Sequence, residues 1–325
     1  MADAPISFKS LEIDAAAEAE RIAEAIRDIV WVQLCRRGVV IGLSGGIDSS
    51  VAAALCVRAM GRERVLGLFM PESDSSKESL RLGKILSKSL GISTVFEDIS
   101  AVLRAAGCYR HRDEAVRLVI PSFGDGWKFK IVMSDSYGST PYAIPSVVAQ
   151  APGAKEITKR LNAQAYSKLV AATNFKQRTR KMIEYYHADL LHYAVVGTPN
   201  RLEYDQGFFV KNGDGSADLK PLAHLYKTQV YQLAAHLQIP EEIQRRPPTT
   251  DTFSLPQSQE ELYFSLSLQH MDMCLFGKNH EICPEAIGNV IGMKGEQVKH
   301  VYSAIDSRRR ATTYLHRAPI LVECV

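Results

Sequence analysis

One short segment constrains the fold of this chain most: a polar glycine turn between an apolar strand and a helix. The β-branched run 38–43 is typical of a buried strand, and Ser44-Gly45-Gly46-Ile47-Asp48-Ser49-Ser50 follows it directly. An apolar helical run, 51–60, comes next and stops at Gly61. A strand that turns so tightly into a helix is a unit of parallel α/β sheets.

This turn has the composition of a phosphate-binding loop. Two glycines permit positive φ and close approach of the backbone to a ligand, and the first N–H groups of a helix are unpaired at the positive end of its dipole. Ser44, Ser49 and Ser50 add hydroxyl donors, so the segment predicts a cradle for phosphate or pyrophosphate. Asp48 alone would repel phosphate, and its presence indicates a Mg²⁺ ion that bridges phosphate oxygens.

Three simpler interpretations of the turn explain less. A plain helix cap needs one Ser or Asp and not this whole series. The segment contains no Gly-Lys-Ser/Thr, so it is not a Walker A loop, and no G-x-G-x-x-G, so it is not a dinucleotide loop.

Apolar runs elsewhere in the first half of the chain predict the same architecture. Residues 65–70 and 94–99 are expected to be strands, 77–90 a helix closed by Gly91, and 13–34 an amphipathic helix. A further strand is expected at 193–196. Strands that alternate with helices at this spacing predict an α/β fold, a parallel sheet with helices on both faces.

The rest of the chain is predicted to be less regular. Residues 101–154 are rich in Gly, Pro, Ser and aromatic residues, which predicts a long irregular segment of functional importance. Helices are expected over 157–192 and 227–237. No linker or repeat is evident, so we expect a single domain over 1–325, with its core at about 20–255 and a helical C-terminal extension at about 256–325.

Composition excludes several classes of protein. The 39 Lys and Arg residues against 36 Asp and Glu give a formal net charge of +3, too small to suggest binding to nucleic acid or a membrane. No apolar run approaches the ~20 residues of a membrane span, and the N-terminus does not read as a secretory signal. The six cysteines are scattered without a CxxC pair, which indicates reduced thiols of a cytoplasmic protein.

The Ser44–Ser49 turn resembles the signature of the PP-loop ATP pyrophosphatases, which cleave ATP between the α and β phosphates, adenylate a substrate and release pyrophosphate. Later segments are similar, in order and spacing, to motifs of the NAD synthetases within that superfamily. The similar segments are Asn174–Arg180, Gly197–Glu203, Gly207–Lys211, Gly213–Asp218, Pro221–Leu222, Lys227–Gln229 and Pro248–Asp251. The resemblance implies a Rossmann-like adenine nucleotide alpha hydrolase fold and an ATP-dependent carbon–nitrogen ligase of NAD biosynthesis.

The same resemblance implies a reaction and its partners. The nicotinate carboxylate of deamido-NAD would attack the α-phosphate of ATP, and ammonia would then displace AMP. A homodimer is implied, with the dinucleotide site at the subunit interface. Only 43 residues precede Ser44, too few for the glutaminase domain of glutamine-dependent members. We therefore expect ammonia to be the direct nitrogen donor, or to come from a separate glutaminase.

The resemblance also implies roles for individual residues. Asp48 and Glu203 are expected to hold Mg²⁺, and Asp48 and Lys227 to be catalytic. Lys227 begins a predicted helix, where the dipole disfavours a cation unless an anion is its partner. Residues matching dinucleotide-binding positions are Arg178, Lys211 and Asp218. Residues expected to contact ATP are Gly42, Leu43, Ser44, Gly45, Gly46, Ile47, Asp48, Ser49, Thr198, Lys227 and Thr249.

The chain departs from the family mainly on the acceptor side. The family's C-terminal His-Lys-Arg has Tyr314–Pro319 as its nearest counterpart, and Gln257–Phe264 replaces an acidic, Gly-containing segment. The main alternative is thus a relative that amidates another carboxylate, such as a sugar acid or a secondary metabolite. Three other hypotheses are less consistent with the residues: a tRNA-thiolating enzyme, a non-catalytic nucleotide sensor, and a DNA-binding helix-turn-helix at 284–305. The basic positions in 176–181 and 308–310 have an alternative reading as solvated helix faces.

Overall fold

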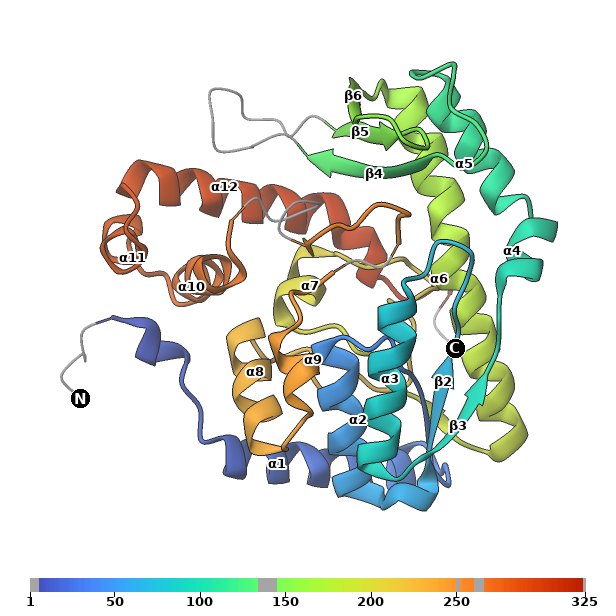
Figure 1. The fold of residues 1–325 in the computed structure, drawn as a ribbon. Helices are drawn as coiled ribbons and strands as arrows, with labels where there is room; N and C mark the ends of the chain where they lie inside the picture. Colours follow the sequence, from blue (N-terminus) through green and yellow to red (C-terminus); the bar gives the residue numbers. More distant parts are fainter. Residues whose placement is uncertain (1–5, 134–144, 250–251, 260–265, 324–325) are drawn as a thin grey trace.

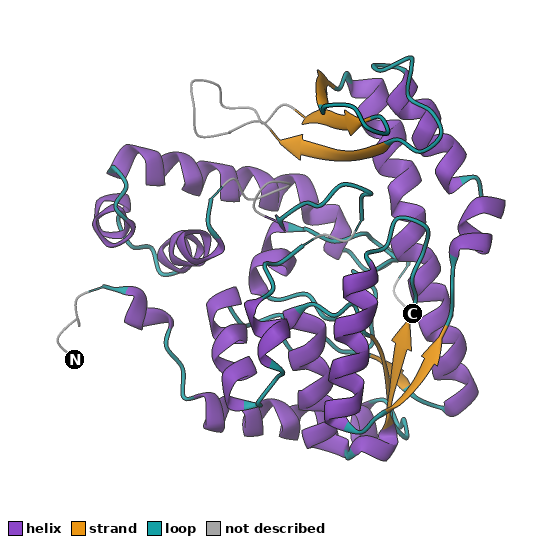
Figure 2. Cartoon of the chain, in the orientation of Figure 1, coloured by secondary structure: helices purple, strands orange, loops and turns teal. Residues whose placement is uncertain are grey.

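The computed structural model describes residues 6–133, 145–249, 252–259 and 266–323 of the chain (Figure 1). Its strands gather in two separate sheets, with helices around and between them (Figure 2). Among the described residues, no helix is both long and apolar enough to cross a membrane.

A four-stranded parallel sheet forms the centre of the fold, as the sequence predicts. The strands lie in the order β3-β2-β1-β7, and Val39 pairs with Val65 on one side and with Ala194 on the other. Because the chain proceeds from β1 to β2 and β3 but returns to the far side of β1 with β7, the order reverses beside β1. The strands are β1 (Val39–Gly42), β2 (Val65–Phe69), β3 (Ser93–Phe96) and β7 (Ala194–Val195).

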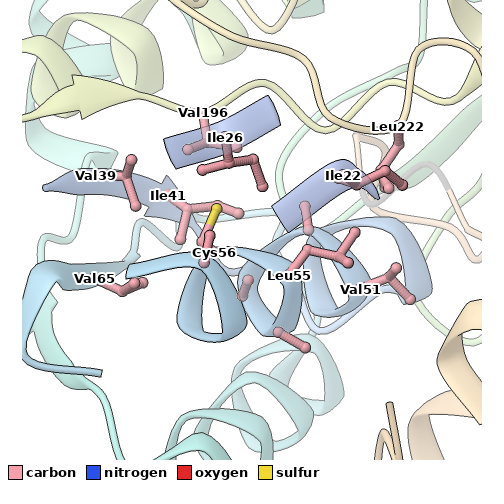
Figure 3. Packing of buried hydrophobic residues seen from close by; sticks show 14 of the residues in the cluster. Ile22, Ile26, Val39, Ile41, Val51, Leu55, Cys56, Val65, Val196 and Leu222 are labelled. Carbon is pink, nitrogen blue, oxygen red and sulfur yellow. The ribbon is translucent and has the colours of Figure 1, made fainter. Parts of the chain in front are cut away.

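One face of this sheet packs against the amphipathic N-terminal helix and the helix after the glycine turn. Val39 and Ile41 point toward this face and meet Ile22, Ile26 and Leu55 in the main core (Figure 3). The helices of this layer are α1 (Ala15–Arg27), α2 (Ile47–Met60), α3 (Lys77–Leu90), α8 (Lys227–His236) and α9 (Glu241–Arg245). The π-helical turn η2 (Asp28–Gln33) continues α1, and the 3-10 turn η3 (Arg62–Arg64) connects α2 to β2.

Successive side chains of a strand point to opposite faces, so Val40 and Leu68 lie on the other side. There they pack with Val195, Leu103 and Ala188. The helices on this side are α4 (Ser100–Ala105), α5 (Cys108–Arg117) and the long α6 (Ala163–Leu191), which also reaches the smaller sheet (Figure 1). The predicted coverage of both faces is confirmed.

The prediction of an irregular segment at 101–154 is wrong for the part that the structure describes. Besides α4 and α5, it contains two strands of an antiparallel sheet with the order β4-β5-β6. The strands are β4 (Lys128–Met133), β5 (Pro145–Gln150) and β6 (Ile157–Arg160). The predicted helix from 157 is also wrong at its start, because β6 comes first and α6 begins at Ala163.

This sheet forms because one of its faces is apolar. Phe129 and Ile131 of β4 and Val147 and Ala149 of β5 bury a separate core together with Leu169. In the sequence of this region, apolar and polar residues alternate only over short stretches, and Gly, Ser and Pro lie between them. Composition alone therefore favours a loop. Residues 134–144, which include part of the aromatic segment singled out in the sequence, lie outside the described residues.

The C-terminal extension is helical, as predicted. Its helices α10 (Leu268–Asn279), α11 (Pro284–Ile291) and α12 (Gly295–Thr312) and the turn η5 (Thr313–His316) surround a core of their own. Leu11 of the N-terminal turn η1 (Phe8–Leu11) and Leu202 of α7 (Arg201–Gln206) belong to that core. Tyr226, at the residue before α8, links it to the main layer.

Candidate active site

The glycine turn has the local geometry that its sequence predicts. Gly45 adopts a φ of +70°, and a Cβ at this position would collide with the carbonyl oxygen of Ser79 in α3. Both requirements favour glycine. The hydroxyls of Ser44 and Ser49 are 3.0 Å apart, and the Ser50 hydroxyl donates to the carbonyl oxygen of Gly46 at 2.8 Å. The side chains thus brace the turn against the first turn of α2.

A cavity of about 490 Å³ opens above this turn. It lies at the carboxyl ends of the parallel strands, beside the point where the strand order reverses, which is where open α/β sheets bind ligands. Most of the predicted ATP and metal residues line it: Gly42, Leu43, Ser44, Gly46, Ile47, Asp48, Ser49, Thr198, Glu203 and Thr249. Gly45 and Lys227 are not among the lining residues, but Lys227 contacts Asp48, which is.

Asp48 is the centre of a polar network on the cavity wall. Its Oδ2 pairs with the Nζ of Lys227, whose side chain is only 1% exposed, and its Oδ1 accepts from the Asn200 amide at 3.0 Å. The Asn200 backbone N–H donates to Glu203 Oε2 at 3.2 Å, and the Gln259 amide donates to Glu203 Oε1 at 2.7 Å. The two predicted metal carboxylates are therefore joined through Asn200.

The electrostatics of this network follow from burial and from the nearness of the two carboxylates. Desolvation, helped by the charge of Asp48, raises the pKa of Glu203 well above its ordinary value. Burial opposes the charge of Lys227, but Asp48 and Glu203 outweigh it and the pKa of Lys227 is raised. The described residues hold no cluster of three or more His, Cys, Asp or Glu that would form an all-protein metal cage. Two hard carboxylates that repel each other beside a phosphate cradle fit Mg²⁺, which usually keeps water and phosphate oxygens as its other ligands.

A buried carboxylate from the C-terminal extension caps α8. Asp272 of α10 is fully buried, and its Oδ2 accepts from the Thr228 backbone N–H at 2.7 Å. Burial raises the pKa of Asp272 to about 6, and hydrogen bonds from the Thr228 and Lys227 backbone oppose that shift. The expected anion partners of the helix start are thus Asp272 for the backbone and Asp48 for the Lys227 side chain.

The three residues predicted to bind the dinucleotide lie outside the cavity lining of this single chain. The exposed Arg178 donates through Nε to the Lys211 carbonyl oxygen at 3.2 Å. Lys211 Nζ donates to the carbonyl oxygens of Tyr314 and Arg317 at 2.7 and 3.0 Å. Asp218 accepts from the backbone N–H of Val195 at 2.7 Å, at the end of β7. Of the three, Lys211 therefore contacts the C-terminal stretch that stands in place of the family's His-Lys-Arg, and Arg178 contacts Lys211.

The alternative of a solvated basic face on α6 is wrong at two of its positions. Lys176 is fully buried and contacts Glu72 at 2.9 Å and Asp74 at 2.7 Å. Lys181 forms a buried ion pair with Glu184 at 2.5 Å on the cavity wall. At the other basic run, Arg309 holds Asp205 at 2.6 Å.

Several residues of the site were not singled out from the sequence. Asn200 had a local signal, because Asn200 and Glu203 form a capping box at the start of α7. Gln259 and Arg246 had none beyond their places near the Pro248–Asp251 motif, of which residues 250–251 lie outside the described residues. Asp214, within the Gly213–Asp218 segment, lines the cavity, and burial raises its pKa.

The antiparallel sheet also contributes to the site. Ile131 and Met133 of β4 line the cavity together with Phe253. The Phe129 backbone N–H donates to the Ser254 hydroxyl at 2.9 Å, and the Leu255 N–H donates to the Phe129 carbonyl at 3.0 Å. β4 therefore holds the loop that carries Gln259 to Glu203.

The cavity lies at the edge of a parallel sheet and is lined by a glycine turn and half-buried carboxylates. These features put the chain in the class of α/β proteins that bind a nucleotide there. Comparison with known proteins narrows this class. A family model described as NAD synthase matches residues 18–119 and 144–314, a match that leaves out β4. The chain belongs to the NAD synthase family.

Individual relatives agree with this assignment. A protein of Mesorhizobium japonicum named NH(3)-dependent NAD(+) synthetase is 57% identical over 96% of this chain and 98% of its own length. The solved NH3-dependent NAD synthetase of Campylobacter jejuni has a TM-score of 0.63 at 21% identity, covering 96% of this chain and 100% of its own. The solved NMN synthetase of Francisella tularensis has a TM-score of 0.64 at 21% identity, covering 95% and 99%. The two structural likenesses confirm the fold.

Proposed function

We propose that this chain is an ammonia-dependent carbon–nitrogen ligase that converts deamido-NAD, ATP and ammonia to NAD, AMP and pyrophosphate. The single observation that carries the proposal is the glycine turn, which opens into a cavity beside the Asp48–Lys227 pair, in a chain of the NAD synthase family. The 57% identity to a relative named for this activity supports the choice of acceptor. The fold alone does not choose it, since it is shared with a protein named NMN synthetase.

A carboxylate reacts poorly with an amine because its oxygen is a poor leaving group. Attack of the nicotinate carboxylate on the α-phosphorus forms an acyl adenylate and expels pyrophosphate. Ammonia then adds to the acyl carbon, loses a proton and displaces AMP. The protein's part is to position the reactants and to neutralise charge.

We assign ATP to the cavity lining described above, with the phosphates over Ser44, Gly46 and Ser49. Thr198 and Thr249, on the same wall, would also contact ATP. Asp48 and Glu203 would hold Mg²⁺, which, when bound, supplies positive charge to the phosphate oxygens. Lys227 would turn from Asp48 toward the leaving pyrophosphate.

We place the dinucleotide near Arg178, Lys211 and Asp218, completed by a second subunit. Arg178 is exposed on α6 and stands four residues before Met182, in a series that continues to Tyr186 and Leu190. These three apolar side chains are 55%, 60% and 66% exposed, which favours contact with a second copy of the chain. Light scattering on the Tyr186→Glu variant tests this: we expect a dimer for the wild type and a monomer for the variant, and a persistent dimer would contradict the assignment.

The decisive assay mixes the purified chain with ATP, Mg²⁺, ammonium and deamido-NAD. We expect NAD, AMP and pyrophosphate in equal amounts. Pyrophosphate release with another carboxylate, but no NAD, would support the alternative acceptor. Glutamine in place of ammonium should give little NAD unless a separate glutaminase is added. We place this activity in the cytoplasm, in keeping with the free cysteines of the described residues.

A further inference from the structure

The leaving pyrophosphate carries several negative charges, and Lys227 is the one cationic side chain among the residues assigned to ATP. Lys227 already faces two carboxylates, and the described Lys and Arg side chains that line the cavity are Arg180, Lys181 and Arg246. Lys181 is paired with Glu184. Arg180 lies on α6 and donates to the Met70 carbonyl oxygen at 3.3 Å, on the far side of β1 from β7.

Arg246 is the cation that lies against the glycine turn itself. It follows α9 directly, and its Nη1 donates to the Gly45 carbonyl oxygen at 3.4 Å. Its Nη2 donates to the Ser79 hydroxyl at 2.9 Å and to the Thr249 hydroxyl at 3.2 Å. The guanidinium thus touches the turn, α3 and the loop of a residue assigned to ATP.

The charge of Arg246 is not neutralised by a close carboxylate in the described part of the chain. The charge of Arg246 acts on Glu78, but this carboxylate is already paired with Arg81 at 2.6 Å. A guanidinium has five N–H donors, and these three bonds use both hydrogens of Nη2 and one of Nη1. The Nε–H and the second Nη1–H are left for phosphate oxygens.

We propose that Arg246 is a catalytic residue that binds the β and γ phosphates of ATP and stabilises the leaving pyrophosphate. This inference rests on the proposed function, since it takes the turn to hold a triphosphate. The interaction strengthens as charge moves onto the pyrophosphate during cleavage, so it lowers the barrier to adenylation as well as aiding ATP binding.

The test compares Arg246→Ala and Arg246→Lys with Arg245→Ala. Arg245 is the adjacent arginine, 75% exposed and paired only with Glu241 in the recorded ion pairs, so it is a matched control outside the site. Inhibition by added pyrophosphate and the KM values for ATP and deamido-NAD are measured on each full-length variant. We expect Arg246→Ala to raise the inhibition constant for pyrophosphate and the KM for ATP by roughly 10- to 100-fold. The KM for deamido-NAD should change less than about threefold, and Arg245→Ala should match the wild type.

Arg246→Lys separates a phosphate ligand from a brace of the turn. Lysine keeps the charge but has fewer and differently placed N–H donors, so we expect a loss of roughly 3- to 10-fold, between the wild type and Arg246→Ala. An unchanged pyrophosphate constant in Arg246→Ala would overturn the proposal. An equal rise of the pyrophosphate inhibition constant in both variants, together with lowered thermal stability, would also overturn the proposal. That result would mean that Arg246 only supports the conformation of the turn, a role that depends on the shape of the side chain and not on its charge.

The outcomes of this test can be distinguished from a failure of the proposed function and from a failure of the variant to fold. If Arg246→Ala does not fold, the pyrophosphate constant of Arg246→Lys decides, and a wild-type value overturns the proposal. If the wild type binds pyrophosphate but makes no NAD, the acceptor assignment fails while Arg246 is still tested. If the wild type makes NAD and Arg246→Ala keeps its pyrophosphate constant, only the Arg246 inference fails.

Discussion

Asp272 of α10 accepts a hydrogen bond from the backbone N–H of Thr228, at 2.7 Å, and so joins the C-terminal extension to the first turn of α8. That turn carries Lys227, whose ammonium group contacts Asp48. The carboxylate of Asp272 is fully buried and aimed at the N-terminus of α8. It therefore caps this helix and fixes the position of Lys227, the first residue of the helix. The extension is therefore part of the construction of the site.

Removing this cap should impair catalysis more than folding. We expect Asp272→Ala to lower kcat on the order of tenfold, because small displacements of a charged group are costly in an active site. Asp272→Asn, whose amide oxygen still accepts, should keep most of the activity. Asp14 caps α1 through two N–H bonds of 3.0 Å, far along the chain from α8, so Asp14→Ala is the matched control. Steady-state kinetics that show equal losses for Asp272→Ala and Asp14→Ala would contradict a role in positioning Lys227.

The charge of Asp272 should also make stability depend on pH. Its pKa is raised from 3.8 to about 6 in the folded protein, so between these values the folded state binds a proton that the unfolded state has lost. The free energy of unfolding therefore falls as pH rises through this window, by about 3 kcal/mol from this group. Urea unfolding of the wild type and of Asp272→Asn at pH 4 and 7.5 measures this change. Between the two pH values, the free energy of unfolding of the wild type should fall by about 3 kcal/mol relative to that of the variant. The same pH dependence in both proteins would argue against the raised pKa of Asp272.

Asp48→Asn should abolish turnover, with a loss of at least about 100-fold. The structure adds a stability cost, because Asp48 is the direct partner of the buried Lys227. We expect the free energy of unfolding to fall by roughly 1–3 kcal/mol. Adding Lys227→Met to Asp48→Asn removes the stranded cation, so stability should recover while activity does not. Substantial NAD formation by Asp48→Asn would refute its assignment to the metal and the phosphates.

The cysteines of the described residues should divide into two groups by reactivity. Burial raises the pKa of Cys56 and of Cys274 to about 12 and that of Cys108 to about 11, so these thiols remain protonated and covered. Cys35 and Cys283 are exposed. Brief alkylation of the native protein at pH 8, read by mass spectrometry, should label Cys35 and Cys283 first and the other three only after denaturation. Native labelling of Cys274 at the rate of Cys283 would show that the C-terminal core opens readily.

Local patterns predicted the parts of this protein that depend on neighbours in the sequence. The strand before Ser44, the positive φ of Gly45 and the helix after Gly46 all lie within a few residues, so spacing and residue type were sufficient. The small antiparallel sheet was not predicted, since its stability comes from the pairing of Phe129 with Ala149 and from packing against α6. A strand of this kind has no strong signal before its partner is known.

Local residue patterns were enough to specify the chemistry of the phosphate turn and the main sheet, because a glycine, a cap or an apolar run acts over one turn of chain. Which charges are free to act depends instead on how the folded chain packs. Asp48 and Lys227 are 179 residues apart along the chain, and Arg246 and Gly45 are 201 apart. Whether a cation is paired, buried or left facing a cavity depends on these distant contacts and on the water they exclude, which no local pattern records.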